Sequence, residues 1–416
     1  MRALALIDGE HYAPVVRAAL AELPYDVVAA HLVGGTEKLR EGADYGVPLA
    51  DTLDGALADH RPQLVVDLSD EPVLGPRERF VLASRVLAHG LPYVGADFRF
   101  DPPELEPFEL PSIGIVGTGK RVGKTAITAH AAQLLSRDRK VVVVSMGRGG
   151  PPEPEVADVP PTVEALLELS DAGRHAASDY LETAALAGVT TVGCRRCGGG
   201  FAGAVFAANV HEGARKAAEL EPELVLFDGS GAALPPVETR RRILVVNAQQ
   251  DPDVVTGYLN GYRHLISDLV VLTMAKEGSG WERLRDRAAE LGPRVVATTL
   301  HPRPAEPVAG RRVAFFSAAP ERAHAGFAAH LADEHGAEVT YVSGSLSNRA
   351  TLREELMTAD ADVFVVELKA AAIDVVAAAA RERGVEVVLA GSDVRPAPGE
   401  PDLDEELRRL ASEATA

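Results

Sequence analysis

One glycine-rich stretch, residues 117–125, limits what this chain can fold into more than any other feature of its sequence. The stretch reads Gly-Thr-Gly-Lys-Arg-Val-Gly-Lys-Thr and directly follows a strand-length apolar run at residues 113–116. After it, Ile127, Ala131 and Leu134 recur at the spacing of one face of a helix. Strand, glycine-rich loop, Gly-Lys-Thr and helix together indicate a P-loop, in which backbone N–H groups surround phosphate oxygens.

Each part of this loop has a predicted role in holding a nucleotide. Glycines let the backbone approach phosphate oxygens closely, and the helix N-terminus adds its positive dipole end. We expect Lys124 to reach the β- and γ-phosphates and the Thr125 hydroxyl to ligate Mg²⁺. Five residues, rather than the usual four, separate Gly117 from Gly123. An ordinary glycine-rich turn is the alternative, but the position directly after a strand favours a site with these contacts: Gly117, Thr118, Gly119, Lys120, Arg121, Val122, Gly123, Lys124 and Thr125.

Composition narrows the partners that this chain can have. Of its 416 residues, 46% are hydrophobic and 25% charged, which is typical of a globular protein. The length predicts two or three domains. The formal net charge is −19. Such acidity argues against a broad nucleic-acid surface, and a polyanionic substrate would need a local basic cluster. The sequence has no apolar run of transmembrane length and no basic-then-apolar leader, so we expect a cytoplasmic protein with no membrane partner.

The order of strand-like and helix-like patterns predicts an α/β protein with parallel sheets. Residues 1–100 are expected to form a doubly wound α/β domain, and residues 101–111, with four prolines, a stiff linker. Residues 112–310 would be the P-loop NTPase domain. Residues 311–416 contain further α/β units, which either extend the P-loop sheet or form a separate domain.

In the first domain, three polar segments follow predicted strands, at residues 8–12, 34–38 and 67–71. Ligands bind at the carboxyl ends of strands in parallel sheets, so the three together favour a site, although each alone is compatible with a plain loop. His11 in the first segment either donates to a phosphate or caps the helix that begins near Pro14.

Several polar residues end predicted strands of the second domain, on the edge where the P-loop lies. The apolar run 224–228 ends in Asp228, the Walker-B pattern for an Mg²⁺ ligand, with an Asp-Gly turn as the alternative. Arg148, Asn247 and Lys276 occupy similar positions and are expected to face the phosphates, although Lys276 is also compatible with a plain surface lysine. Residues 194–203 are interpreted as a glycine-rich loop with Arg195 and Arg196, which bind substrate or are solvent-exposed charges.

Two remaining patterns have more than one interpretation. Cys194 and Cys197 are the only cysteines and supply half of a structural zinc site, so they are structural, shared between subunits as a metal site or disulfide, or redox-active. Arg240, Arg241 and Arg242 form a charge run before a strand and are interpreted as a solvated edge. The tail from Asp402 is predicted to be a charged amphipathic helix that covers the fold.

The sequence resembles known families at three places. The pattern Gly-Thr-x-x-x-Val-Gly-Lys-Thr is similar to the P-loop of dethiobiotin synthetase. The run Asp-Gly-Glu-His-Tyr-Ala-Pro-Val at residues 8–15, the run Gly-Gly-Thr-Glu-Lys-Leu at residues 34–39 and the chain length together resemble the cyclic 2,3-diphosphoglycerate synthetase family. The resemblance implies that ATP and 2,3-diphosphoglycerate give ADP, phosphate and a cyclic product with an internal pyrophosphate.

For this reaction we expect two successive phosphoryl transfers. Lys124, Lys120 and Asp228 would be catalytic, with Mg²⁺ on Thr125 and Asp228, and Asn247 would contact the nucleotide. The candidate substrate-binding residues are Arg148, Arg195, Arg196, Lys276 and His11. We expect a homodimer that uses ATP and Mg²⁺. The alternatives are another P-loop kinase or ligase, for example of the phosphoglycerate kinase type, and a nucleotide-dependent switch or partitioning ATPase.

Overall fold

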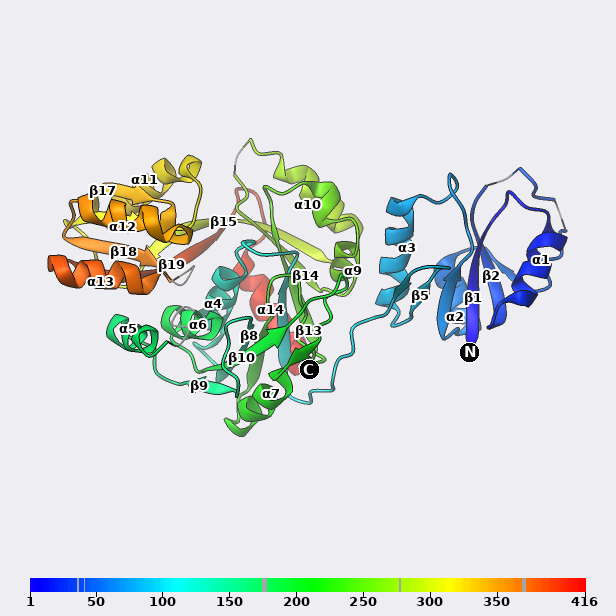
Figure 1. The fold of residues 1–416 in the computed structure, drawn as a ribbon, viewed down its shortest axis with the longest axis horizontal. Helices are drawn as coiled ribbons and strands as arrows, with labels where there is room; N and C mark the ends of the chain where they lie inside the picture. The colour runs from blue at the N-terminus through cyan, green and yellow to red at the C-terminus, as the bar shows by residue number, and fades with distance from the viewer. Residues whose placement is uncertain (36, 41, 174–177, 277, 369–371) are drawn as a thin grey trace. The chain divides into compact units, whose positions relative to one another are not determined.

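A computed structural model describes residues 1–35, 37–40, 42–173, 178–276, 278–368 and 372–416, and these residues form two compact units (Figure 1). The first unit comprises Met1–Glu104, Gln250–Ile266 and Arg287–Pro293, and the second comprises Leu105–Gln249, Ser267–Asp286 and Arg294–Ala416. Thr36, in one of the predicted polar segments, and Glu277, which follows Lys276, lie outside the described residues. The predicted α/β class is confirmed in both units.

The first unit is built on a sheet with strand order β3-β2-β1-β4-β5-β6, parallel except for the β5–β6 pair. Apolar residues of β1 and β4 are fully buried, as expected for strands covered on both faces. Helix α3 packs against α9, which the chain contributes from a later segment. The elements are β1 (Arg2–Asp8), α1 (Ala13–Glu22), β2 (Asp26–Gly34), β3 (Leu49–Ala50), α2 (Leu53–His60), β4 (Leu64–Asp67), α3 (Pro76–Ala88), β5 (Tyr93–Val94), β6 (Arg99–Phe100), α8 (Pro252–Val255) and α9 (Asn260–Leu265).

The second unit contains a sheet with strand order β11-β10-β8-β12-β7-β13-β14-β15-β19-β18-β16-β17, and β9 pairs with β10. Its P-loop part is parallel from β10 to β15. The elements here are β7 (Ser112–Gly117), α4 (Lys124–Leu135), β8 (Val141–Gly147), β9 (Glu155–Ala157), α5 (Val163–Asp171), α6 (Asp179–Ala187), β10 (Thr191–Cys197), β11 (Ala207–Ala208), α7 (Val210–Glu219), β12 (Leu224–Asp228), β13 (Arg241–Asn247), β14 (Leu269–Thr273) and β15 (Arg294–Pro304). Helix α10 (Trp281–Glu290) begins in the second unit, and its residues from Arg287 onward belong to the first.

The C-terminal strands extend this sheet. The long strands β15 and β19 pair antiparallel from Thr298 opposite Pro396 to Pro304 opposite Ala390, and Figure 1 shows them joining the two parallel blocks. The proposed division into domains remains a prediction, because a continuous sheet does not place a boundary. The elements are β16 (Arg312–Phe316), the short 3-10 helices Glu321–Ala323 and Ser345–Ser347, α11 (His324–His335), β17 (Glu338–Ser343), α12 (Arg349–Thr358), β18 (Val363–Glu367), α13 (Ile373–Arg383), β19 (Glu386–Pro396) and α14 (Leu403–Thr415).

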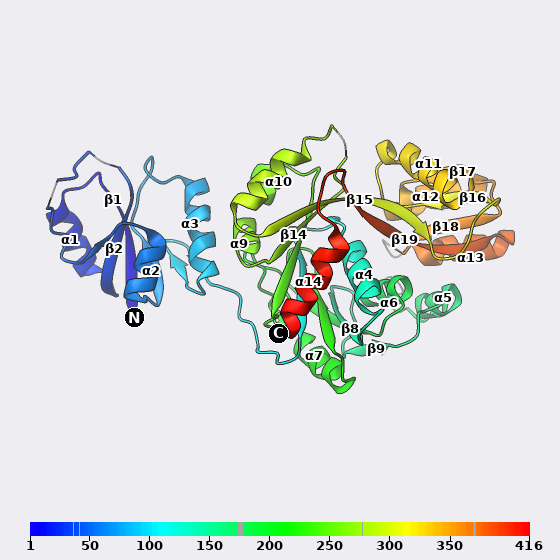
Figure 2. The ribbon, with the colours of Figure 1, turned by 180° about the vertical axis from the view of Figure 1, so that it is seen from behind.

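The C-terminal helix α14 covers the P-loop part of the sheet and contacts β7, β13 and α4 (Figure 2). One face buries Leu403, Leu407 and Leu410, together with two alanines, in the same apolar cluster as β7 and α4. This i, i+4, i+7 spacing is the apolar stripe of an amphipathic helix. The prediction of a covering amphipathic helix is therefore confirmed.

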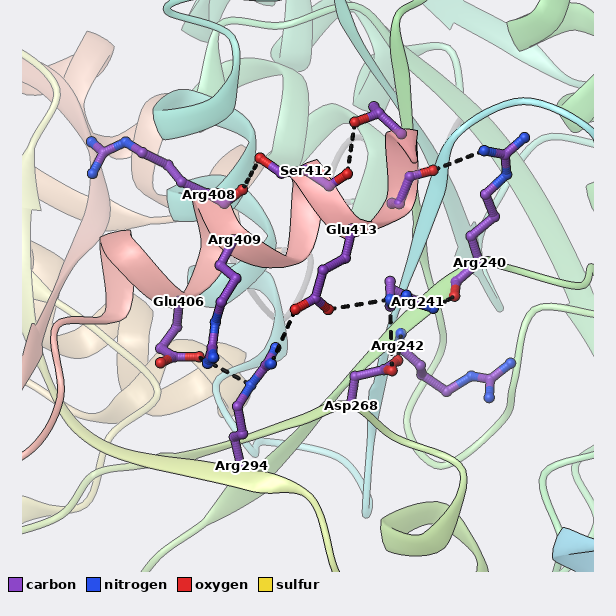
Figure 3. Close-up of polar contacts among 12 residues, drawn as sticks. Arg240, Arg241, Arg242, Asp268, Arg294, Glu406, Arg408, Arg409, Ser412 and Glu413 are labelled. Carbon is purple, nitrogen blue, oxygen red and sulfur yellow. Dashed lines mark hydrogen bonds and ion pairs between the residues drawn. The ribbon is translucent and has the colours of Figure 1, made fainter.

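The arginine run at the start of β13 is exposed at Arg240, as the predicted solvated edge requires, but its side chains also contact the C-terminal helix. Arg240 Nη1 donates to the carbonyl of Ala414 at 3.0 Å, and Arg241 Nε lies 3.3 Å from Glu413 Oε2 (Figure 3). The last carbonyls of a helix lack partners within the helix and carry partial negative charge, so cations near them are favourable. Arg240 and Arg241 therefore fasten the end of α14 to the sheet, a contact between segments that a local charge pattern does not reveal.

Two local predictions in the P-loop part are wrong. The proline- and glutamate-rich composition of residues 151–161 predicts a surface loop, but this segment contains β9, which pairs antiparallel with β10. Residues 194–197, interpreted as the start of a glycine-rich loop, complete β10 and pair with β8 and β11. In both places pairing with a neighbouring strand decides the conformation, whereas proline and glycine dominate the local sequence.

Candidate functional site

The P-loop is held in place by β13 and β14, which lie on one side of β7 in the sheet. The Thr118 N–H donates to the carbonyl of Val245 on β13 at 3.2 Å, and Thr273 Oγ1 on β14 donates to the carbonyl of Val122 at 2.7 Å. Gly123 has φ of +83°, and a Cβ atom there would lie 3.0 Å from side-chain atoms of Leu300 and Thr273. Only glycine adopts this conformation readily in so little space. The loop is thus fixed before a ligand arrives.

Helix α4 begins at Lys124, directly after this loop. The first N–H groups of a helix have no partners within the helix and lie at its positive end, which suits a phosphate. Thr125 follows in the same turn. Arg121 has φ of +60°, a conformation that is uncommon outside glycine and typical of tight functional turns. The predicted nucleotide loop therefore has the backbone shape that phosphate binding needs.

Asp228 ends β12 and receives three side chains. Lys124 Nζ lies 2.5 Å from its Oδ1, Thr128 Oγ1 donates to the same oxygen at 2.8 Å, and Ser145 Oγ lies 3.4 Å from Oδ2. The Asp228 carboxylate is fully buried and the Lys124 side chain is 10% exposed. A buried carboxylate is stable only when charge and hydrogen bonds compensate it. The contact joins the P-loop lysine to the predicted Walker-B aspartate.

A cluster of positively charged side chains lies around the turn that follows β12. Arg196 is buried on β10 and donates from Nη2 to the carbonyl of Ser230 at 3.0 Å. A Cβ atom at Gly231 would lie 3.6 Å from Cγ of Lys120 and 3.8 Å from Arg196 Nη2. The structure therefore brings Lys120 and Arg196 together around the turn that follows Asp228.

Arg148 adds positive charge to this group. Burial lowers the pKa of Arg196, the nearby charge of Arg148 lowers this pKa further, and the Asp179 carboxylate opposes both effects. Positive charges held close together, which Asp179 compensates only in part, favour an anion between them. Arg148 is exposed directly after β8, so its side chain is accessible to a ligand.

Asn247 and Lys276 lie on the other side of the P-loop strand, at the ends of β13 and β14. The Asn247 Oδ1 accepts from the N–H of Gln249 at 2.9 Å, which closes the turn after β13. Lys276 is exposed and close enough to His301 to lower the pKa of its imidazole, although burial is the larger cause. Their roles with nucleotide and substrate stay predictions.

Arg195 differs from Arg196 although the two are adjacent. Successive side chains of a strand point to opposite faces, and Arg195 is exposed whereas Arg196 is buried. The same alternation separates the cysteines, because Cys194 is buried and Cys197 exposed, and both are free thiols. Burial raises the pKa of Cys194 to about 12, so this thiol is inert. The Cys-x-x-Cys spacing therefore does not bring both sulfur atoms to one side of β10.

His11 belongs to the first unit, where the three predicted polar segments come together. Its Nδ1 lies 3.2 Å from Asp8 Oδ1, and the N–H of Asp70 donates to Asp8 Oδ2 at 3.3 Å. The Gly9 N–H donates to the carbonyl of Gly34 at 2.8 Å. The expectation that the segments share one sheet edge is confirmed, while the role of His11 toward substrate stays a prediction.

Sequence reasoning missed the hydroxyl groups around Asp228. Thr128 follows Lys124 by four residues and so lies on the same face of α4, and Ser145 interrupts a run of valines in β8. Both are buried, at 0% and 1% exposure. A polar residue at a core position of an apolar pattern is the signal that could have identified them.

Strand, loop, helix and the Lys124–Asp228 pair define the class of this protein as a P-loop nucleotide-binding protein. Family models extend this class to the whole chain. The models described as the N-terminal, P-loop and C-terminal domains of cyclic 2,3-diphosphoglycerate synthetase match residues 2–101, 112–289 and 304–393.

Proteins named cyclic 2,3-diphosphoglycerate synthetase are similar along the full length. That of Rubrobacter xylanophilus is 50% identical, covering 100% of this chain and 98% of the relative. Those of Methanothermus fervidus and Thermococcus onnurineus are 40% and 41% identical, covering 92% and 95% of this chain and 91% and 96% of the relatives. The chain belongs to the cyclic 2,3-diphosphoglycerate synthetase family, a family of enzymes.

Two further observations complete these comparisons. Among solved structures, LpxK from Aquifex aeolicus in complex with ATP matches at 13% identity with a TM-score of 0.41, covering 75% of this chain and 91% of that chain. None of the helices in the described part of the chain is both long and apolar enough to cross a membrane.

Proposed function

We propose that this chain uses ATP to close 2,3-diphosphoglycerate into its cyclic diphosphate, releasing ADP and inorganic phosphate. The observation that carries the proposal is the full-length similarity to proteins of that name, in a chain whose P-loop lysine pairs with Asp228. The positive groups around the P-loop support it, because the substrate carries a carboxylate and two phosphates.

The residues around Asp228 fit Mg²⁺, which prefers oxygen ligands from carboxylates, hydroxyls, water and substrate phosphates. Asp228 is a buried carboxylate, and Thr125 offers a hydroxyl in the first turn of α4. When bound there, Mg²⁺ would neutralise charge on the β- and γ-phosphates. Asp228 and Thr125 are the residues that we propose hold it.

The first step transfers the γ-phosphoryl group of ATP to one phosphate of the substrate. An oxygen of that phosphate forms the new P–O bond, the bond between the β–γ bridging oxygen and the γ-phosphorus breaks, and ADP leaves. Lys124 exchanges Asp228 for the γ-phosphoryl oxygens, and Lys120 contacts the same group. Both lysines stabilise charge that develops during transfer, the main contribution of protein groups to this chemistry.

The second step closes the ring. An oxygen of the other substrate phosphate attacks the phosphorus atom that now carries the transferred group, and inorganic phosphate leaves. Arg148 and Arg196 hold the two negative phosphates close despite their repulsion, with Arg195, Lys276 and His11 as further predicted contacts. Holding both reacting groups in position replaces a large entropic part of the barrier.

Phosphorus NMR tests this reaction directly. The purified protein, incubated with ATP, Mg²⁺ and 2,3-diphosphoglycerate, should give a new pyrophosphate-type signal together with equal amounts of ADP and inorganic phosphate. A linear phosphorylated product would support the kinase alternative. Hydrolysis of ATP without a cyclic product, stimulated by a macromolecule rather than by the phosphorylated acid, would support the switch alternative and contradict the proposal.

We also propose that the enzyme acts in the cytoplasm as a homodimer, without a nucleic-acid or membrane partner. Its net charge of −19 supports the absence of nucleic acid. Light scattering coupled to size exclusion, at concentrations near those of the assay, should give twice the chain mass. The mass of a single chain under assay conditions would contradict the dimer.

A further inference from the structure

A cluster of metal-ligating side chains lies away from the P-loop, between α11 and β19. His330 and His335 come from α11 and Asp393 from β19, and one ligand atom of each lies within 4.8 Å of the others. His330 is 9% exposed. His301, which is opposite Asp393 in the β15–β19 register, stacks on His330 with ring centroids 4.6 Å apart. Three potential ligands from two elements thus converge at one place, and the His301 ring packs against one of them.

The two histidines of α11 leave polar atoms without partners. Nε2 of His330 and Nε2 of His335 are both buried and make no hydrogen bond within the described part of the chain. Buried polar atoms in folded proteins are nearly always hydrogen-bonded, and an exception needs an explanation such as an ion. Two such atoms in histidines that lie close to each other and to a carboxylate indicate a ligand that is shared by these residues.

We propose that His330, His335 and Asp393 bind a divalent transition metal ion, with Zn²⁺ as the best-fitting representative. Two imidazoles and one carboxylate are a ligand set that Zn²⁺ accepts in tetrahedral geometry, with the fourth position left to water or a further side chain. Mg²⁺ prefers oxygen ligands, so this site is chemically distinct from the one at Asp228.

Charged side chains around the cluster hold its carboxylate in place. Arg303 Nε lies 3.3 Å from Asp393 Oδ1, and Arg395 Nη2 lies 3.8 Å from Asp393 Oδ2 and 3.4 Å from Glu334. These arginines orient the carboxylate, and Glu334 offsets part of their charge. Partners of this kind fix the direction of metal ligands and tune their affinity.

The site would join parts of the fold that the chain itself connects only distantly. A metal ion shared by His330, His335 and Asp393 cross-links α11 to β19. Arg303, which pairs with Asp393, also donates to Gln133 Oε1 on α4 at 3.1 Å. We therefore infer a structural ion that stabilises the second unit close to the helix that carries Lys124, without contacting the reacting phosphates.

Zinc titration of the full chain tests the inference. The Cys197→Ser protein, which lacks the exposed thiol, is stripped with chelator and titrated with Zn²⁺ in the presence of excess Mg²⁺. We expect a single Zn²⁺ per chain and a higher melting temperature in zinc. Replacement by Co²⁺ should give the visible absorption of a four-coordinate ion.

Ligand variants in the same background separate this site from surface histidines. His335→Gln and Asp393→Asn should each weaken Zn²⁺ affinity by about tenfold or more and remove the zinc-dependent rise in melting temperature. His324→Gln, at the start of the same helix and outside the cluster, should bind like the parent. Equal affinity in all four proteins, or loss of zinc only with His324→Gln, would overturn the assignment. Cyclisation does not enter this readout, so the proposed reaction can fail independently.

Discussion

In each unit, a buried strand ends in an aspartate at the carboxyl edge of a parallel sheet. The side chains that contact these two carboxylates differ. Asp67 of β4 accepts from the Tyr93 hydroxyl at 2.6 Å and from Ser69 Oγ at 2.5 Å, with Arg79 Nε at 3.2 Å. Asp228 of β12 has one charged partner, the ammonium of Lys124, at the end of a flexible side chain.

The difference separates a structural carboxylate from one that can exchange its partner. The Tyr93 hydroxyl and the Arg79 guanidinium belong to packed elements, so both stay bound to Asp67. Burial, together with the hydrogen bond to Asp67, raises the pKa of Tyr93. Lys124 can move to incoming phosphates and leave Asp228 to a cation. We infer that the edge of the second unit carries the chemistry and that Asp67 maintains the loop after β4.

The largest effect should follow from Lys124→Ala. Loss of one group that stabilises the transition state costs about 3 kcal/mol, and a lysine on the transferring phosphoryl group should cost at least that in kcat/KM. Cyclic product measured by phosphorus NMR should therefore fall by two orders of magnitude or more. Lys140→Ala, at the opposite end of β8, is the control and should retain activity.

Folding must be checked for this variant, because removal of Lys124 leaves the buried Asp228 carboxylate without its ion pair. Circular dichroism and the melting temperature show whether the variant is folded. A folded Lys124→Ala protein with normal turnover would show that the P-loop lysine takes no part in the reaction. The proposed difference between Asp228 and Asp67 would then be wrong.

Matched Asp→Asn substitutions in the two units test the comparison itself. Asp228→Asn should lower turnover by about two orders of magnitude, because an amide is a poor Mg²⁺ ligand. Asp67→Asn should lower the free energy of unfolding by about 1–3 kcal/mol, since it weakens hydrogen bonds to a charged group, and leave turnover per folded molecule unchanged. Denaturant unfolding and product formation are the measurements. Loss of turnover in a fully stable Asp67→Asn protein would show that the first unit participates in the chemistry.

A smaller effect should follow from Arg196→Ala. A hydrogen bond to a charged group contributes about 1.5–3 kcal/mol, so the KM for 2,3-diphosphoglycerate should rise about tenfold or more, with a smaller change in the KM for ATP. Arg195→Ala should change KM less, because its side chain is exposed on the opposite face of β10. Arg215→Ala, exposed on α7, is the control. Equal KM values for Arg196→Ala and this control would exclude Arg196 from the substrate site.

Much of the second unit could be predicted because its signals are local. The valine-rich strands, the glycine loop and the helix spacing each identify one element, and parallel pairing then places Asp228 beside the P-loop. The partners of Asp228 could not be predicted as firmly, since Thr128 and Ser145 are ordinary residues that acquire a role only through burial.

Contacts between distant segments account for what the sequence did not reveal. The arginine run at 240–242 has no local reason to bind the C-terminal helix, and β9 forms only because β10 lies beside it. Similarly, His330 and Asp393 come together through the pairing of β15 with β19 and the packing of α11. The local sequence around these residues indicates neither contact. The sequence pattern predicts most of the helices and strands, whereas tertiary packing determines which of them contact one another.

The smallest expected effect is a pH dependence of the first unit. Burial lowers the pKa of His264, on α9, to about 4, although a contact with the Val255 carbonyl opposes the shift. Between pH 6.5 and 4 the unfolded chain therefore binds more protons than the folded one, so stability is lost as the pH falls. From pH 7.5 to 5.5 the loss should be about 1 kcal/mol.

Hydrogen exchange resolves this effect by region. Amides of α9 and α3, which pack together, should exchange faster at pH 5.5 than at pH 7.5, after correction for the intrinsic rate, while those of β7 and β12 should not change. His264→Gln should reduce the pH dependence, whereas His89→Gln should not, because His89 is half exposed beside Asp54. An exchange rate of α9 and α3 that does not change between these pH values would show that His264 does not lower the stability of the first unit in acid.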